Sequence, residues 1–191
     1  MKLILASTSP FRKQLLDKLE LEYETASPDV DETPLPGENI KAMVVRLSQA
    51  KAKAVADHFP DALIIGSDQS AVLNGQPLTK SGGFDKAFQQ LKDASGQKII
   101  FHTGLCLLNT KTGHMQSACI PYTVVFKTLS NEQIKNYLQK EQPYNCAGSF
   151  KSEGLGIALF ERFEGEDPNA LIGLPLIKLI EMLSEEGLSP V

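Results

Sequence analysis

Short apolar runs alternate with longer amphipathic stretches along this chain. Residues 3–6 and 62–69 form the clearest apolar runs, and because both are brief and nearly uncharged they predict buried strands. Apolar residues recur at helical spacing between positions 40 and 55, which predicts a long helix over residues 38–59. Mixed strands and helices predict an α/β or α+β fold around one main sheet.

Turn and cap residues place the remaining elements. Asn74-Gly75 predicts a hairpin turn after a short strand over residues 71–73, and Ser130 with Gln133 predicts a capping box at the start of a helix. The acid- and proline-rich segment 22–36 is expected to be an extended loop. Further strands are predicted over residues 99–108, 118–127 and 157–163, and further helices are predicted to begin near positions 10, 84 and 175.

Length and composition are those of an ordinary globular protein. The 191 residues suit a single domain over residues 1–191, with 42% hydrophobic and 22% charged residues. A net charge of -4 argues against nucleic acid as the main partner. No run approaches the ~20 apolar residues of a membrane span, and the run after Met1-Lys2 is too short for a signal peptide. We therefore expect a cytoplasmic protein with no membrane partner.

The cysteine and histidine residues follow no ligand pattern. The three cysteines are odd in number and far apart, so they predict neither a disulfide framework nor a zinc site. The three histidines are equally scattered. We interpret all six as structural or surface residues.

The N-terminal turn combines several groups that bind anions. Ser9 is a favourable N-cap, and Pro10 fits the first helical position because its missing N–H is not needed there. The turn therefore gathers the hydroxyls of Ser7 and Ser9, the Arg12 guanidinium and the free N–H groups of a helix start. The pattern fits either an anion site or a helix cap with no further role.

Two charged residues stand out against their apolar surroundings. Lys51 lies within the apolar stripe of the long predicted helix, so its ammonium group must either reach solvent or meet an anion. Asp68 follows a buried strand, where carboxylates of α/β proteins often lie in a ligand-binding crevice; the alternative is a turn or cap aspartate. Arg46 lies off the stripe and is expected at the surface, as are the acids of the loop, Glu32 among them.

Six short segments, spread in order over almost the whole chain, form a further pattern. They are Ser7-x-Ser9-Pro10-x-Arg12, Val30-Asp31-Glu32-Thr33, Lys51-Ala52, Gly66-Ser67-Asp68-Gln69, Ala147-Gly148-Ser149-Phe150 and Gly173-Leu174-Pro175-Leu176. Together they resemble the signature of the Maf family of nucleoside triphosphate pyrophosphatases. The resemblance implies a two-lobed fold, similar to that of inosine triphosphate pyrophosphatases, with a central mixed sheet and an interlobe cleft. It also implies a homodimer.

Within that family the chain resembles the branch that hydrolyses 7-methyl-GTP. Asp68-Gln69 and the segment Ser149-Phe150-Lys151-Ser152-Glu153-Gly154 carry this resemblance. Relatives acting on dTTP and UTP have Gln at the position of Glu153 and Arg at the position of Phe11. The resemblance therefore implies hydrolysis of 7-methyl-GTP to 7-methyl-GMP and pyrophosphate, as housecleaning of modified nucleotides.

The resemblance also implies residue roles. Asp68 would be the proton acceptor or would hold the attacking water, and Glu32 would join it at a divalent metal, Mg or Mn. The triphosphate would be held by Ser7, Ser9, Arg12, Lys51 and Lys80, and the base would be chosen by Phe11, Gln69 and Glu153. Two departures from the family pattern are Ala50, where an acid commonly precedes the lysine, and Ser81, where a proline commonly follows Lys80.

Several alternatives stay open at this level. Phe11 could stack on the base, or it could be a core residue, because Leu15 and Leu19 follow at four-residue spacing. Glu153 could accept both donors of the guanine edge, whereas another base would need different partners. The function alternatives are the same reaction on dTTP, UTP or another modified nucleotide, and a nucleotide-binding regulator of cell division with little turnover. Asp68 favours an enzyme, because a carboxylate beside phosphates repels them unless a metal intervenes.

Overall fold

The computed structural model describes all residues from 1 to 191, and it confirms the expected mixed α/β class. One sheet has the strand order β2-β1-β3-β5-β6-β7, with β4 paired to β3. β1 pairs in parallel with β2 and β3, whereas β4 and β7 pair antiparallel with β3 and β6. The sheet is therefore mixed, as predicted.

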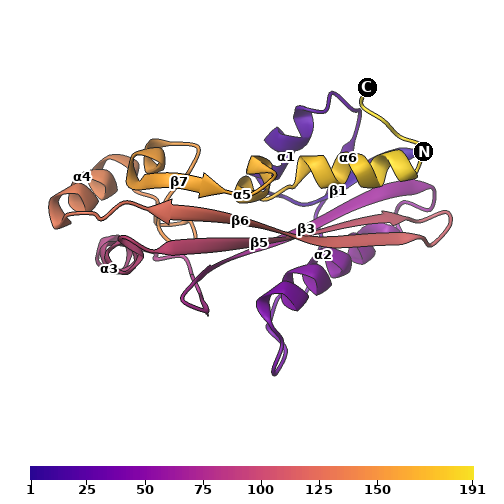
Figure 1. The fold of residues 1–191 in the computed structure, drawn as a ribbon. Coiled ribbons are helices and arrows are strands. Elements are labelled where there is room, and N and C mark those ends of the chain that lie inside the picture. Colours follow the sequence, from indigo (N-terminus) through magenta and orange to yellow (C-terminus); the bar gives the residue numbers. More distant parts are fainter. The chain divides into compact units, whose positions relative to one another are not determined.

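The elements have the following bounds, and Figure 1 labels most of them. The strands are β1 (Lys2–Ala6), β2 (Glu24–Ala26), β3 (Ala62–Leu73), β4 (Gln76–Pro77), β5 (Lys98–Asn109), β6 (Met115–Phe126) and β7 (Phe160–Glu164). The helices are α1 (Pro10–Asp17), α2 (Ile40–Ala56), α3 (Phe84–Ala94), α4 (Asn131–Glu141), α5 (Pro168–Ile172), α6 (Leu176–Glu185) and a 3₁₀ helix, η1 (Leu155–Leu159).

The chain divides into two compact units. The first comprises residues 1–69, 102–120 and 167–191, and the second comprises residues 70–101 and 121–166. Strands β3, β5 and β6 each contribute residues to both units. Each unit is described by itself below.

The first unit is a layer of strands between helices. Alternate residues of β1 point to opposite faces, so that Leu3 and Leu5 join one core cluster while Ile4 and Ala6 join the other. The first cluster includes apolar residues of α1 and α6, and the second includes residues of α2. Figure 1 shows α6 and α2 on opposite sides of the strands. This three-layer arrangement fixes α2 against the face that carries Asp68.

Two glycines allow α2 to lie directly on the sheet. A Cβ atom added at Gly66 of β3 would lie 2.1 Å from the Ser48 carbonyl oxygen, and one added at Gly104 of β5 would lie 2.1 Å from the Val44 carbonyl oxygen. No side chain fits between the helix backbone and these strands. The close contact brings Lys51 of α2 to the strand that carries Asp68.

The second unit is built around an aromatic cluster. Phe150 makes edge-on contacts with three other rings, Phe101, Phe126 and Phe160, at centroid distances of 5.2–5.7 Å. Such geometry suits the quadrupoles of aromatic rings. The predicted capping box at Ser130 is confirmed at the start of α4. The cluster anchors the small-residue loop that precedes η1.

The structure corrects three sequence-based predictions of elements and adds one helix. β3 continues without a break to Leu73, whereas the sequence predicted separate strands over residues 62–69 and 71–73. β2 lies inside the predicted loop 22–36, because it pairs with the edge of β1. The predicted strand over residues 157–163 begins as η1, and only β7 is extended. The added helix is α5, which has five residues and was not predicted.

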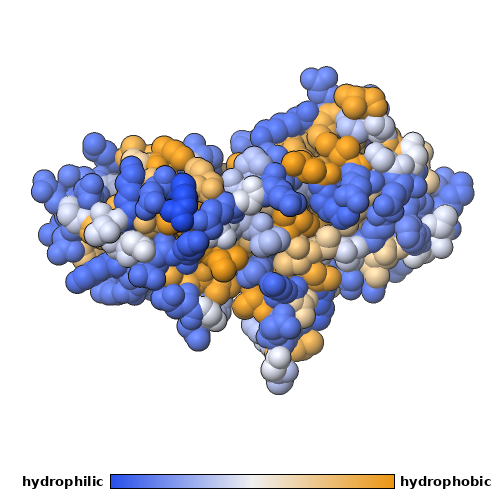
Figure 2. Space-filling model, in the orientation of Figure 1, coloured by the Kyte–Doolittle hydropathy of each residue, from blue (hydrophilic) through white to orange (hydrophobic).

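None of the helices combines the length and apolar character needed to cross a bilayer. The face drawn in Figure 2 is largely hydrophilic, with separate hydrophobic patches. Exposed apolar side chains include Met1, Ile157 and Ile177.

Candidate active site

The turn after β1 forms the cap that the sequence predicts. Ser9 has an extended backbone and its hydroxyl oxygen accepts the Arg12 N–H at 3.4 Å, while Pro10 occupies the first position of α1. The Ser7 hydroxyl oxygen accepts the Ser9 N–H at 3.1 Å. Since each hydroxyl oxygen is used as an acceptor, each hydroxyl hydrogen can still be donated to an anion. The cap and the anion site are therefore compatible in one turn.

Arg12 is held by the segment that follows α5. Its Nε donates to the carbonyl oxygen of Gly173 at 2.9 Å, and the Ser67 hydroxyl lies 2.9 Å from the same oxygen. Gly173 has a φ of +120°, a conformation that favours glycine. Burial lowers the pKa of the Arg12 guanidinium, while the charges of Asp68 and Glu32 act in the opposite direction. A guanidinium stays charged in such surroundings, so Arg12 provides a fixed positive group.

Lys51 is the centre of the charged cluster. Its Nζ atom lies 2.7 Å from Asp68 Oδ1 and 2.7 Å from Glu32 Oε1. Lys51 is 7% exposed and Asp68 is 8% exposed, so this pair is buried, whereas the Glu32 side chain is largely in solvent. The ammonium group thus meets anions instead of reaching solvent. Glu32, expected as a surface acid, is still exposed but belongs to the cluster.

These groups surround a small cavity within the first unit. Its volume is about 200 Å³. The lining residues are Ala6, Ser7, Thr8, Ser9, Arg12, Pro28, Glu32 and Lys51. Positive side chains, two serine hydroxyls and a helix N-terminus face one space, with two carboxylates beside the lysine. This arrangement can hold a polyanion and place a carboxylate next to it.

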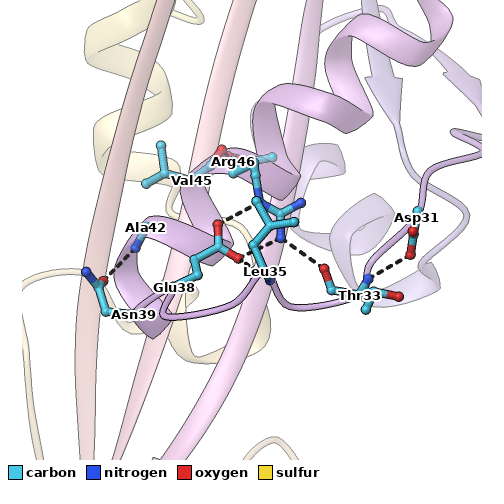
Figure 3. A network of polar contacts seen from close by, with 9 residues as sticks. Asp31, Thr33, Leu35, Glu38, Asn39, Ala42, Val45 and Arg46 are labelled. Carbon is cyan, nitrogen blue, oxygen red and sulfur yellow. Dashed lines mark hydrogen bonds and ion pairs between the residues drawn. The ribbon is translucent and has the colours of Figure 1, made fainter.

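Arg46 is partly exposed, in line with its expected place at the surface, and it organises the loop that carries Glu32. Its guanidinium bonds both carboxylate oxygens of Glu38, at 2.6 and 2.7 Å, and donates to the Thr33 carbonyl oxygen at 3.2 Å (Figure 3). Asp31 accepts the Thr33 N–H at 2.9 Å, and Glu38 accepts the Leu35 N–H. The hydrogen bonds from Arg46 are the largest cause of the lowered pKa of Glu38. One side chain of α2 therefore fastens the loop on the C-terminal side of Glu32.

Gln69 and Phe11, which the sequence places at base-choosing positions, lie in the same unit. The Gln69 amide nitrogen is within hydrogen-bond distance of Thr103 Oγ1 and of the carbonyl oxygens of Ala170 and Leu171. Phe11 is 40% exposed, so it is not the core residue that its spacing allowed. Its ring is available for stacking, and its role in base choice stays a prediction, as does that of Gln69.

Lys80 and Glu153 belong to the second unit. Lys80 is exposed and forms an isolated antiparallel bridge with Ala147. Glu153 is exposed, and one of its carboxylate oxygens accepts a hydrogen bond from Ser152 at 3.2 Å. The predicted site residues that the structure brings together are Ser7, Ser9, Arg12, Glu32, Lys51 and Asp68. For Lys80 and Glu153, the structure describes only their surroundings within the second unit.

Three residues that support the cluster escaped the sequence reasoning. Ser67 and Gly173 lie within recognised motifs, but nothing local indicates that Ser67 would reach the carbonyl group that holds Arg12. Thr103 is fully buried and its hydroxyl donates to the Ala170 carbonyl oxygen at 2.8 Å. A buried threonine in an apolar strand was the available signal, since buried hydroxyls require partners.

Comparisons with known proteins cover nearly the whole chain. A family model described as "Maf-like protein" matches residues 2–186. A 7-methyl-GTP pyrophosphatase of Nitrosococcus oceani is 54% identical over 185 residues, covering 97% of this chain and 93% of that protein. A 7-methyl-GTP pyrophosphatase of Alcanivorax borkumensis is 57% identical over 185 residues, covering 97% and 94%. A solved structure of the Staphylococcus aureus Ham1 protein covers 66% of this chain and 71% of that one, at 16% identity and a TM-score of 0.43.

Proposed function

The chain belongs to the Maf-like protein family, and on that premise we propose that it hydrolyses 7-methyl-GTP to 7-methyl-GMP and pyrophosphate. The observation that carries the reaction is Lys51 Nζ at 2.7 Å from both Asp68 and Glu32, beside the cavity at the start of α1. The two relatives, which match along nearly the whole chain, are 7-methyl-GTP pyrophosphatases, and this supports the choice of substrate. The reaction suits a housecleaning enzyme that removes modified nucleotides.

The phosphates are held by the groups around the cavity. Arg12 and Lys51 provide charge, and each charged hydrogen bond contributes about 1.5–3 kcal/mol. Ser7 and Ser9 donate their hydroxyl hydrogens, and the first N–H groups of α1 add the positive end of the helix dipole. Lys80 is the remaining residue that the family resemblance assigns to the triphosphate.

Asp68 is proposed to orient the attacking water and accept its proton. The water oxygen forms a bond to the α-phosphorus, the bond from that phosphorus to the bridging oxygen breaks, and pyrophosphate leaves. Lys51 Nζ lies 2.7 Å from the Asp68 carboxylate and holds it in place beside the phosphates. No covalent enzyme intermediate is required.

The chemistry of the donor set fits a divalent metal, Mg or Mn. One oxygen of Glu32 and one of Asp68 lie at 2.7 Å from the same ammonium nitrogen, so they are no further apart than twice that distance. No three His, Cys, Asp or Glu side chains lie close enough together to hold a metal ion by themselves. Two carboxylates are the set with which Mg²⁺ commonly binds when substrate phosphates and waters complete its shell. When bound, the metal supplies positive charge to the phosphate oxygens.

Base choice is assigned to Phe11, Gln69 and Glu153. Guanine presents two adjacent N–H donors, and the Glu153 carboxylate can accept a hydrogen bond from each. Methylation at N7 makes the ring cationic, which favours contact with a carboxylate and with an aromatic face. Glu153→Gln is therefore expected to lower the preference for 7-methyl-GTP over dTTP and UTP by about tenfold or more. Pyrophosphate release from a panel of canonical and modified nucleoside triphosphates measures this preference.

The matched control for that panel is Glu161→Gln, which changes an exposed acid of β7 in the same unit. We expect its substrate ranking to equal that of the wild type. An unchanged ranking in Glu153→Gln would refute the assignment of the base. If the wild type instead hydrolyses a different nucleotide, the proposed reaction stands and the proposed substrate is refuted.

Arg46 gives a prediction about metal dependence. Arg46→Met releases the loop that carries Glu32, so the Mg²⁺ concentration for half-maximal activity is expected to rise about 10–100-fold. Arg162→Met is the control, because Arg162 also forms ion pairs with carboxylates but lies on β7. A magnesium titration of both variants measures the effect. An equal Mg²⁺ requirement in Arg46→Met and the wild type would contradict a metal at Glu32.

The expected homodimer and cytoplasmic location are part of this proposal. The homodimer rests on the family resemblance, and the cytoplasmic location rests on the nucleotide substrate of the proposed reaction. A nucleotide substrate of metabolism is found in the cytoplasm, which agrees with the proposed reaction. Sedimentation of the purified chain distinguishes a dimer from a monomer.

A further inference from the structure

The second unit contains a side-chain amide that joins two loops and that the proposed reaction does not use. Gln90 lies on α3 and is half-buried. Its amide nitrogen donates to the Thr79 carbonyl oxygen at 2.9 Å, and its amide oxygen accepts the Ser149 hydroxyl at 2.5 Å. Thr79 directly precedes Lys80, and Ser149 lies four residues before Glu153. One amide therefore connects the loop of a proposed phosphate ligand to the loop of a proposed base-choosing residue.

Backbone contacts join the same two loops. Lys80 and Ala147 form an isolated antiparallel bridge, and the Gly148 N–H lies 3.5 Å from the Thr79 carbonyl oxygen. The Gly82 N–H donates to the Tyr144 carbonyl oxygen at 2.9 Å. The Ser81 hydroxyl lies 3.4 Å from the same Tyr144 oxygen. All of these bonds lie outside the regular sheet. The side-chain bonds of Gln90 are thus a substantial part of what fixes one loop against the other.

Ser149 adopts a backbone conformation that needs such support. Its φ is +61°, in the left-handed region that non-glycine residues seldom adopt, and it follows Gly148 at +75°. The Ser149 side chain is fully buried, and Gln90 is its hydrogen-bond partner. Unfavourable backbone conformations persist where the surroundings determine them, and they gather at functional sites. The bond to Gln90 holds the turn from which the rest of the loop extends.

The loop beyond Ser149 is fixed at its next residues. Phe150 packs in the aromatic cluster, and the Lys151 N–H donates to the Tyr137 hydroxyl at 3.1 Å. Glu141 accepts the Leu155 N–H at 2.9 Å. These contacts and the bond from Ser149 to Gln90 together hold the segment that carries Glu153.

We infer that Gln90 is a positioning residue that sets the Lys80 loop and the Glu153 loop in one fixed arrangement, and so couples phosphate binding to base choice. This inference rests on the proposed function for the roles of Lys80 and Glu153. The structural half, that one amide fixes both loops, is independent of any substrate. Loss of the amide changes both nucleotide affinity and nucleotide preference, because both loops move.

Two variants test the two hydrogen bonds of the Gln90 amide separately. Gln90→Leu removes both hydrogen bonds with little change in volume. Gln90→Glu keeps an acceptor for the Ser149 hydroxyl but has no hydrogen to donate to the Thr79 carbonyl oxygen. Gln89→Leu is the matched control, because Gln89 is the neighbouring residue of α3, is exposed, and bonds only Asp93.

The first readout is hydrogen exchange of the full chain without nucleotide. In Gln90→Leu, amides of residues 79–82 and 146–154 are expected to exchange about 3–10-fold faster for each hydrogen bond lost. In Gln90→Glu the increase is expected mainly in residues 79–82. Equal exchange in Gln90→Leu and Gln89→Leu would overturn the inference, and Gln90→Glu decides the matter if Gln90→Leu does not fold.

The second readout is equilibrium binding of 7-methyl-GTP and GTP in an Asp68→Asn background, which needs no turnover. Adding Gln90→Leu is expected to weaken 7-methyl-GTP binding and to lower its preference over GTP by about 3–10-fold. Faster hydrogen exchange in both loops together with an unchanged preference for 7-methyl-GTP over GTP would overturn the coupling. A wild type that hydrolyses no nucleotide would refute the proposed function instead, while both readouts would still decide the role of Gln90.

Discussion

Asp68→Asn is expected to lower turnover of 7-methyl-GTP by about 10²–10⁴-fold while the protein stays folded. The amide has nearly the same shape as the carboxylate but cannot accept the proton of the attacking water. Lys51 keeps its ion pair with Glu32 in this variant, so no buried charge is left alone. Steady-state release of pyrophosphate, together with the urea midpoint of unfolding, measures both parts of the prediction.

The control for Asp68→Asn is Asp85→Asn, which changes an exposed acid in the first turn of α3. Its turnover is expected to equal that of the wild type. Binding of 7-methyl-GTP to Asp68→Asn is expected to persist, because the phosphate-binding groups are intact. Turnover of Asp68→Asn within a factor of about three of the wild type would contradict the assigned role of the carboxylate.

Lys51→Met is expected to affect both stability and activity. Methionine keeps most of the side-chain volume but leaves the Asp68 carboxylate buried without its partner, which costs about 3 kcal/mol of unfolding free energy. Glu32 contributes little to this loss, because its side chain is 60% exposed. One charged contact to the phosphates is also lost, so kcat/KM is expected to fall about 10–100-fold. Urea unfolding and initial rates measure the two effects.

Lys53→Met is the control for that variant, since Lys53 is exposed on the same helix two residues away. Its unfolding midpoint and its kcat/KM are expected to match the wild type. If Lys51→Met and Lys53→Met unfold at the same urea concentration, the buried pair is not what holds α2 to β3 at this point. The double variant Lys51→Met, Asp68→Asn is expected to recover part of the lost stability, because it removes the unpaired charge.

The sequence predicted the parts of the site that depend on neighbouring residues. Ser9 and Pro10 mark a helix start wherever they occur before an amphipathic run, and the structure confirms that cap. Lys51 was conspicuous because an ammonium group within an apolar stripe needs an explanation, and the structure provides one in Asp68 and Glu32. Local chemistry was sufficient to select these residues as candidates.

Contacts between distant residues could not be predicted in this way. Helical spacing places Arg46 off the apolar stripe, and the side chain is partly exposed as expected. No local pattern shows that the preceding loop turns back onto it. The Ser67 hydroxyl meets a carbonyl group 106 positions away, and Gln90 meets Ser149 across 59 positions. The predicted break in β3 was wrong because it also depends on distant contacts. Asp68 and Gln69 are polar, but their side chains have hydrogen-bond partners on opposite faces of the strand, so the strand continues.

The most direct test of the account follows the oxygen atom of the attacking water. Wild-type protein hydrolyses 7-methyl-GTP in water enriched in oxygen-18, and mass spectrometry measures the label in both products. The account predicts one labelled oxygen in the phosphate of 7-methyl-GMP and none in pyrophosphate, because water attacks the α-phosphorus. Label in pyrophosphate, or release of orthophosphate in its place, would contradict it.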